Sequence, residues 1–410
     1  MSCFSRNWEE KHLPIIAFSH TIWDGQWAGR QHTLSRLGKR GWPVLYSNGA
    51  LYSHQCTKAQ YFGYEEQRDA VHVYKPGKIF PRNYKIPLAD RWAIKHHCKK
   101  LKQILSIGQN DEFIAFCFNP SFLPYIQELR PTYLLYHMFD AYHFIGEVEN
   151  QYHEQLVNMA DLVTAVNHTV WDEMIKNPDI ERHIVENGVD ISSFDTDRQV
   201  SDISSRIEKI PGPRIGYLGT INRKLDYVLL NHLAKQFPTC HFVFLGRMMN
   251  NTIKDDAQKW TAYQDFFQRD NVTHAGQITK EHIPFCLDLM DIQIAPYLGT
   301  KESWMFAAYP LKINEYLASG KPVVSAHTAP IKQYFEGYID ICRTPEEWVD
   351  AIQRNLAGIT TATREERITY ARQNDWENRV DKFEQYIHTL ITRKTACCST
   401  AMTAHSHDQR

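Results

Sequence analysis

Lys312 and Glu315 lie three positions apart in a segment that has the pattern of one short helix. Pro310 suits the first helical position, where a missing N–H costs nothing, and Gly320 suits the helix end. A helix N-terminus with a lysine in its first turn favours an anionic ligand such as a diphosphate. A carboxylate one turn further along can accept hydrogen bonds from sugar hydroxyls. These residue types and spacings outline a nucleotide-sugar site.

A glycine-containing turn at 216–219 offers groups for the same anion. Glycine there lets backbone N–H groups approach a phosphate without a Cβ in the way. Arg223 and Lys224 in the same loop are candidate cationic partners, although two solvated cations in an ordinary strand-to-helix turn are an equal alternative. The pattern GxGxxG is absent, and the next strand ends at 245–247 without a ribose-binding acid, which disfavours NAD.

Apolar strand-like runs alternate with helical patterns along the whole chain, which indicates parallel sheets covered by helices. In the first half, strands are expected over 13–19, 43–47, 71–74, 112–118, 132–138, 161–166 and 183–186, with helices over 27–39, 89–105, 148–160 and 169–176. Ligands of such sheets bind outside the carboxyl ends of the strands. We therefore expect the 219–224 turn and the 312–315 segment to converge on one pyrophosphate pocket.

A series of segments in the C-terminal half resembles the GT-B glycosyltransferases, particularly the group 1, or family 4, type of bacterial surface-polysaccharide synthesis. The segments are 214–220, 225–234, 241–246, 272–276, 291–297 and 309–325. The resemblance implies two Rossmann-like parallel-sheet domains facing a cleft, with the donor nucleotide in the C-terminal domain and the acceptor in the N-terminal one. It implies metal-independent hexosyl transfer, with no cofactor besides a UDP- or GDP-linked donor sugar. The expected donor-binding residues are Gly219, Arg223, Lys224, Tyr297, Lys312 and Glu315.

One position departs from the family pattern. Many retaining members carry two glutamates eight positions apart, the later one contacting ribose; Glu315 matches the later residue, but the earlier position is Ala307. Ribose binding by Glu315 is therefore expected, while the sugar contacts and the anomeric outcome stay open. The aromatic loop 297–309 is a candidate to replace the missing sugar contact, or a lid that only covers the domain interface.

In the N-terminal half, Asp140 follows a buried strand, in a segment similar to one in exopolysaccharide glucuronosyltransferases. The resemblance implies a general base that takes the acceptor hydroxyl proton; a helix N-cap or loop aspartate is the alternative. His143 is a candidate to orient the acceptor. The glycine-rich loop with Trp23 and Asp24 suits stacking on an acceptor sugar, the alternative being core packing.

Composition limits the partners. With 46 basic and 47 acidic residues the net charge is −1, which argues against nucleic acid. Nine cysteines without a CxxC pair, a charged start and no apolar run of about 20 residues predict a cytoplasmic protein without an ordinary signal peptide or transmembrane span.

The segment 75–102 holds nine basic residues and one acid, Asp90. With an apolar face of Trp92, Ile94, Leu101 and Ile104, it predicts peripheral contact with the anionic inner face of the cytoplasmic membrane. A solvated basic helix is the alternative.

We expect an acceptor domain over 1–195, a linker over 196–213, a donor domain over 214–375, a helix crossing back over 376–394, and a disordered tail over 395–410. The predicted function is transfer of a sugar from a nucleotide sugar to a glycan or lipid-linked acceptor. Two alternatives stay open: a nucleotide-sugar 2-epimerase of the same fold, and a non-catalytic glycan-binding or assembly subunit.

Overall fold

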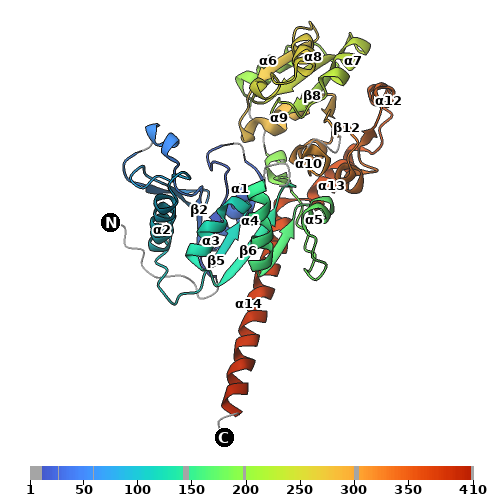
Figure 1. The fold of residues 1–410 in the computed structure, drawn as a ribbon. Helices are drawn as coiled ribbons and strands as arrows, with labels where there is room; N and C mark the ends of the chain where they lie inside the picture. The colour runs from blue at the N-terminus through green and yellow to red at the C-terminus, as the bar shows by residue number, and fades with distance from the viewer. Residues whose placement is uncertain are drawn as a thin grey trace. The chain divides into compact units, whose positions relative to one another are not determined.

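The computed structural model describes residues 12–25, 27–58, 60–141, 147–196, 200–299 and 304–407. The chain forms two compact units, Met1–Glu186 with Arg379–Arg410, and Asn187–Asn378 (Figure 1). The division at Glu186 lies before the expected linker at 196–213, and part of that linker is the helix α6 (Asp202–Glu208). Each unit is described by itself.

The first unit is built on a seven-stranded sheet in the order β3-β4-β2-β1-β5-β6-β7. The strands are β1 (Ile15–Phe18), β2 (Val44–Ser47), β3 (Tyr64–Arg68), β4 (Val71–Lys75), β5 (Ile114–Cys117), β6 (Tyr133–Met138) and β7 (Leu162–Ala165). The helices are α1 (Gly29–Lys39), α2 (Pro87–Ile104), α3 (Leu123–Leu129), α4 (Glu147–Met159) and α5 (His168–Met174). All neighbouring strands pair in parallel except β3, which pairs antiparallel with β4.

Most expected elements of this unit are present, with three differences. The sequence analysis missed β3 and α3, and the strand expected over 183–186 is reduced to a single bridge between Ala165 and Ile184. β3 reads Tyr-Glu-Glu-Gln-Arg and has no buried residue, so it lacks the apolar alternation by which strands are recognised.

The second unit has a six-stranded, fully parallel sheet in the order β10-β9-β8-β11-β12-β13. The strands are β8 (Arg214–Leu218), β9 (His241–Leu245), β10 (Val272–Gly276), β11 (Ile292–Ala295), β12 (Val323–Ala326) and β13 (Asp340–Cys342). The helices after α6 are α7 (Tyr227–Gln236), α8 (Ala257–Phe267), α9 (Ile283–Asp288), α10 (Leu311–Ala318), α11 (Ala329–Phe335), α12 (Pro345–Leu356) and α13 (Arg364–Gln373). The strand order reverses between β8 and β11, and such a switch point is where open parallel sheets bind ligands.

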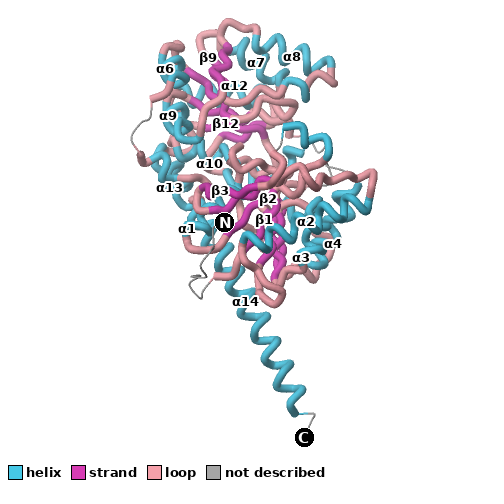
Figure 2. Tube along the Cα trace, turned by 90° about the vertical axis from the view of Figure 1, so that its left-hand side faces the viewer, coloured by secondary structure: helices cyan, strands magenta, loops and turns pink. Residues whose placement is uncertain are grey.

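The last helix, α14 (Trp376–His407), joins the first unit from Arg379 onward. It is drawn as one continuous helix in Figure 2. The expectation of a disordered tail from residue 395 is therefore wrong, because the helix continues to His407. The segment 376–407 contains neither glycine nor proline, so the loss of the apolar period after 395 does not interrupt the helix.

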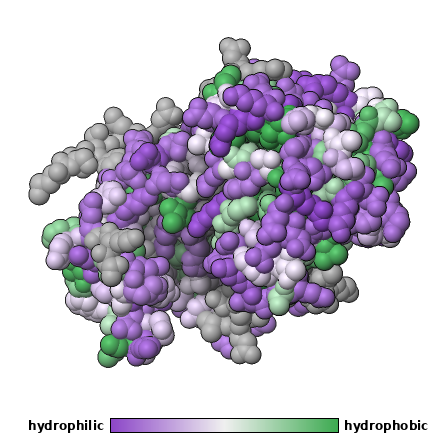
Figure 3. Space-filling model, turned by 90° about the horizontal axis from the view of Figure 1, so that it is seen from above, coloured by the Kyte–Doolittle hydropathy of each residue, from purple (hydrophilic) through white to green (hydrophobic). Residues whose placement is uncertain are grey.

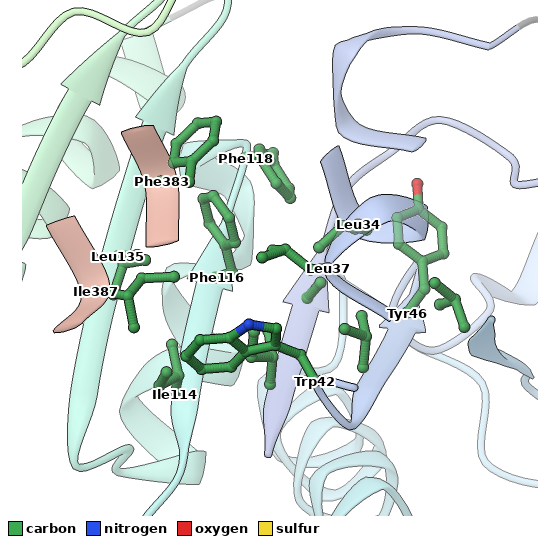
Figure 4. Packing of buried hydrophobic residues seen from close by; sticks show 14 of the residues in the cluster. Leu34, Leu37, Trp42, Tyr46, Ile114, Phe116, Phe118, Leu135, Phe383 and Ile387 are labelled. Atoms are coloured by element: carbon green, nitrogen blue, oxygen red, sulfur yellow. The ribbon is translucent and has the colours of Figure 1, made fainter. Parts of the chain in front are cut away.

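The core of the first unit includes one face of α14. Val380, Phe383 and Ile387 are buried there, and the ring of Phe383 lies 5.4 Å from that of Phe116 on β5 (Figure 4). At the edge of this core, Arg40 bonds to Glu384, which also accepts a hydrogen bond from the Trp42 indole. The helix therefore completes the first unit.

The surface seen in Figure 3 is mostly hydrophilic, with smaller hydrophobic groups between. Within the described ranges, the helices are too short or too polar to cross a bilayer.

Candidate functional site

Lys312, in the first turn of α10, lies over the carboxyl end of β8. Its Nζ donates a hydrogen bond to the Tyr217 hydroxyl at 2.9 Å and lies 4.3 Å from the centre of that ring. The same Nζ is 5.5 Å from the centre of the Tyr297 ring, which follows β11. The lysine therefore lies near the ends of β8 and β11, the two strands that flank the switch point.

The helix that carries Lys312 is fixed by its own residues. Pro310 is the N-cap, one position before the helix begins, and Gly320 ends the segment with φ +72°. Ile313 and Leu317 are fully buried on the core side, and the Tyr316 hydroxyl accepts a hydrogen bond from the Leu218 N–H at 2.8 Å. This bond ties α10 directly to β8.

Gly219 makes room for Lys312. The glycine has φ +133°, and a Cβ there would lie 2.2 Å from the lysine Nζ. Its N–H donates to Leu245 O at 2.7 Å, so it is used within the sheet and not offered to a phosphate. The expected glycine is in place, but what it provides is space and backbone conformation.

The 219–224 turn brings a second lysine to the same place. Leu298 N donates to Lys224 O at 2.9 Å, which ties the turn to the end of β11. The Lys224 Nζ lies 6.0 Å from the centre of the Tyr297 ring, and the Lys312 Nζ lies 5.5 Å from the same centre. Arg223, in the same turn, is exposed to solvent. Lys224 and Lys312 thus both lie near the Tyr297 ring, whereas Arg223 lies at the surface.

Burial shifts the charges of this cluster strongly. It lowers the pKa of Lys224 to about 8. It also lowers the pKa of Lys312 well below its ordinary value, and repulsion from Lys224 lowers that pKa further. Burial raises the pKa of Glu315 to about 7, against the opposing effect of Lys312. Two half-buried lysines beside one half-buried carboxyl group form a site in which a bound anion would stabilise the protonated lysines.

The position of the missing glutamate, Ala307, is buried, as are Met305 and Tyr309 of the aromatic loop. Tyr309 O accepts a hydrogen bond from the Asn187 side chain at 3.0 Å. The described end of the loop is therefore packed into the second unit, while residues 300–303 lie outside the described residues.

Asp140, in the first unit, follows β6 and is half-buried. Burial raises the pKa of its carboxyl group, and the nearby Arg30 guanidinium opposes this. Since α4 begins at Glu147, Asp140 is not its N-cap. A carboxyl group with a raised pKa next to a fixed cation has the properties of a general base, as well as those of a loop aspartate.

Arg30 is a residue that the sequence analysis did not single out. Its Nη1 donates to Ser19 Oγ at 3.3 Å, and its guanidinium carbon lies 5.0 Å from the centre of the Phe139 ring. These contacts fix the cation near the end of β6. Tyr217 was missed in the same way, although it lies two residues before Gly219, and alternate residues of a strand share a face.

The three residues expected on the acceptor side, Trp23, Asp24 and His143, do not form one site among the described residues. Trp23 is 1% exposed, its indole donates to Asp69, and its ring packs on Tyr46, so the stacking role expected for it is wrong. The glycine-rich loop directs this indole into the core because Tyr46 and Asp69 provide its apolar and polar partners. Asp24 is exposed and forms an ion pair with Lys75 at 2.6 Å. His143 lies outside the described residues.

Replacement of Arg30 by Gln is expected to move the acid limb of the activity profile to higher pH. The guanidinium lowers the pKa of Asp140, so its loss raises that pKa and the carboxylate forms only at higher pH. The measurement is kcat/KM against pH for Arg30→Gln and for Lys39→Gln, which removes an exposed charge from the same helix. Lower activity with an unmoved acid limb would mean that Arg30 only supports the fold.

Residues 212–357 match the family "Glycosyl transferases group 1". A Bacillus subtilis protein named as a glycosyltransferase of teichuronic acid biosynthesis, TuaH, is 28% identical over 230 residues, which cover 54% of this chain and 55% of that protein. The match thus spans about half the length of this curated relative.

Three solved structures align with more than nine-tenths of the chain. Sucrose-phosphate synthase of Thermosynechococcus elongatus matches 93% of this chain and all of its own, with TM-score 0.71 and 14% identity. Anabaena HepE, solved with UDP and glucose, matches 92% of this chain and all of its own, with TM-score 0.67 and 15% identity.

A trehalose-6-phosphate structure from E. coli, bound with UDP-2-fluoro glucose, matches 92% of this chain and 98% of its own, with TM-score 0.65 and 10% identity. At these identities the alignments establish the fold. Together with the two parallel sheets, they show that the chain has the GT-B fold, and residues 212–357, from β8 to α12, match the group 1 glycosyl transferases.

Proposed function

We propose that the protein transfers a sugar from a nucleoside-diphosphate sugar to a glycan or lipid-linked acceptor in surface-polysaccharide synthesis. The observation that carries the proposal is the pair of half-buried lysines, Lys224 and Lys312, which both lie against the Tyr297 ring at the switch point of the second sheet. A diphosphate bound there would supply the missing negative charge. The structures of HepE with UDP and the name of the B. subtilis relative support the same class of reaction.

We assign each residue the following role in the reaction. Lys312 and Lys224 hold the diphosphate and stabilise its added negative charge as the bond between the anomeric carbon and the phosphate oxygen breaks. Glu315 accepts hydrogen bonds from the ribose hydroxyls, and Tyr297 positions the two lysines. The acceptor hydroxyl oxygen forms the new bond to the anomeric carbon, and Asp140 takes its proton.

These lysines provide positive charge at the place where other transferases use a metal ion, so we propose metal-independent transfer. Gly219 contributes by leaving space for the Lys312 side chain, and the exposed Arg223 of the same turn is proposed to contact a bound phosphate from the solvent side.

For the location, we propose the cytoplasmic side of the membrane, with peripheral contact through 75–102. The support is the excess of basic residues in this segment and the acceptor class suggested by the relative's name. Lipid-linked intermediates of polysaccharides lie at a membrane surface, where basic segments are attracted to anionic headgroups.

The donor proposal is tested by a thermal-shift screen with UDP, GDP, TDP and CMP and their sugars. A ligand that binds only the folded state at about 100 times its Kd stabilises that state by about 2.7 kcal/mol. We expect UDP or GDP and their sugars to raise the melting temperature. If every nucleotide leaves it unchanged, the proposed donor site is refuted.

Product analysis then separates transfer from the alternatives. Nucleotide release that depends on an added acceptor identifies a transferase. Epimerised or hydrolysed donor without a glycan product would identify an epimerase, and nucleotide binding without any turnover would identify a binding subunit.

A further inference from the structure

Exposed apolar side chains are concentrated in one stretch of the first unit, residues 61–92. Large hydrophobic residues with at least two-fifths of their surface exposed cluster between residues 61 and 92. They are Tyr61, Phe62, Tyr64, Ile79, Tyr84, Ile86, Leu88 and Trp92, which we call the apolar patch. Leu88 is 81% exposed and Phe62 is 76% exposed. Single exposed apolar residues are ordinary, but a cluster of this kind marks an interaction surface.

The patch is held by specific contacts. Arg82 forms a two-pronged ion pair with Asp90, with 2.9 Å from Nε to Oδ1 and 2.7 Å from Nη2 to Oδ2. The Arg82 guanidinium also lies 4.9 Å from the centre of the Tyr52 ring. These contacts fix the segment before α2 to the first turn of the helix. They also neutralise Asp90, the one acid within 75–102.

The outer face of α2 continues the patch with positive charge. Leu88 and Trp92 are exposed near its start, and Arg91, Lys95 and Lys99 are exposed beside and beyond them. The inner face is buried through Ala93, Ile94, His97, Cys98 and Leu101. Ile94 and Leu101, which the sequence analysis assigned to a membrane-facing stripe, therefore belong to the core.

A recess of about 160 Å³ opens within the same surface. Tyr61, Phe62 and Ile79 of the patch contribute to its lining, together with Phe80 and His96. Lys78 lies on this side as well, with its Nζ 4.0 Å from the centre of the Tyr61 ring. The Trp92 ring lies 5.3 Å from the ring of Phe80, so the exposed start of α2 adjoins the lining of this recess.

We propose that the apolar patch inserts into the outer part of an anionic lipid bilayer while the basic residues of α2 contact its headgroups. Aromatic and leucine side chains partition into the headgroup and upper acyl region, and Lys and Arg pair with anionic lipids. The charge pattern favours a bilayer over a second copy, because two copies would bring the basic faces of α2 together. The proposed function gives this surface an electrostatic contact with the membrane, and the present inference adds insertion of apolar side chains. It rests on the proposed function only for the location of the acceptor at the membrane.

The first experiment is flotation of the full-length protein with vesicles of phosphatidylglycerol and phosphatidylcholine, and with phosphatidylcholine alone. Leu88→Ser/Trp92→Ser is expected to lower partitioning into the anionic vesicles about tenfold or more, at high as well as low salt. Lys95→Gln/Lys99→Gln is expected to lower it about fivefold per charge at low salt and little at high salt. The matched control is Val200→Ser/Ile359→Ser, two residues of similar exposure in the second unit, which should partition like the wild type.

Insertion has its own readout. Phospholipids brominated on the acyl chains should quench Trp92 fluorescence in the wild type, and Trp92→Leu should bind equally well with less quenching. Equal partitioning of Leu88→Ser/Trp92→Ser and the wild type would overturn the inference. So would a wild-type dimer that this variant converts to monomer, which would show that a second copy covers the patch. Nucleotide binding by the patch variant is measured separately. Failure of the vesicle test would therefore leave the donor proposal intact, and failure of nucleotide binding would leave the membrane inference intact.

Discussion

Replacement of Lys312 by Ala is expected to abolish sugar transfer while the protein stays folded. Lys312 is half-buried between Tyr217 and Tyr297, where a charge-assisted hydrogen bond to a phosphate oxygen contributes about 2–3 kcal/mol. UDP affinity should therefore fall about 30- to 150-fold. The loss of kcat should be about 100- to 1,000-fold, since the same group stabilises the leaving diphosphate.

The fold should tolerate this change because a desolvated ammonium group is removed from the site. Calorimetric titration with UDP, initial rates with a donor sugar and the melting temperature are the measurements. Lys332→Ala, which removes an exposed lysine from α11 of the same unit, is the matched control. If Lys312→Ala binds UDP as tightly as the wild type, the diphosphate does not bind in this pocket.

The pH dependence of UDP binding follows from the same geometry. The pKa of Lys224 is lowered to about 8 in the free protein, and a bound diphosphate stabilises the protonated lysine and raises that pKa. Binding is then accompanied by proton uptake, so the contribution of Lys224 to affinity is complete below pH 8 and declines as the pH rises above it. Titrations in buffers of different ionisation enthalpy count these protons, and Lys224→Arg should flatten the decline.

The sequence alone predicted the convergence of Lys312, Glu315 and Lys224, for a general reason. In a parallel sheet all strands end on one edge, so residues just after β8 and in the helix after β11 meet even though about 90 residues separate them. No knowledge of side-chain packing is needed for that step. The same rule placed Asp140 at the end of β6.

Positions that depend on packing could not be predicted in this way. Trp23 and Trp27 occupy the same glycine-rich loop, and only the presence of Tyr46 and Asp69 decides that Trp23 is the buried one. Arg30 reaches the neighbourhood of Asp140 from another element, so no local pattern connects them. The apolar patch was hidden for the same reason, since exposure is a property of the fold.

Asp140→Asn is expected to lower kcat about 100- to 10,000-fold, the range over which a positioned general base contributes. Asparagine keeps the shape of the side chain but cannot take the acceptor proton. UDP binding should be unchanged because that site is built from the second unit. The fold should be retained or slightly stabilised, since burial raises the pKa of Asp140 and its charged form is disfavoured.

The pH profile separates a base from an aspartate that only positions the acceptor. If Asp140 is the base, the acid limb of kcat/KM disappears in Asp140→Asn, and the residual rate rises with pH as hydroxide replaces the carboxylate. A positioning role would instead raise KM for the acceptor and keep the acid limb. Asp179→Asn, at an exposed position of the same unit, is the control. Because Arg30 lowers the pKa that sets this limb, Arg30→Gln and Asp140→Asn should be non-additive, and full activity of Asp140→Asn would assign the proton transfer to another group.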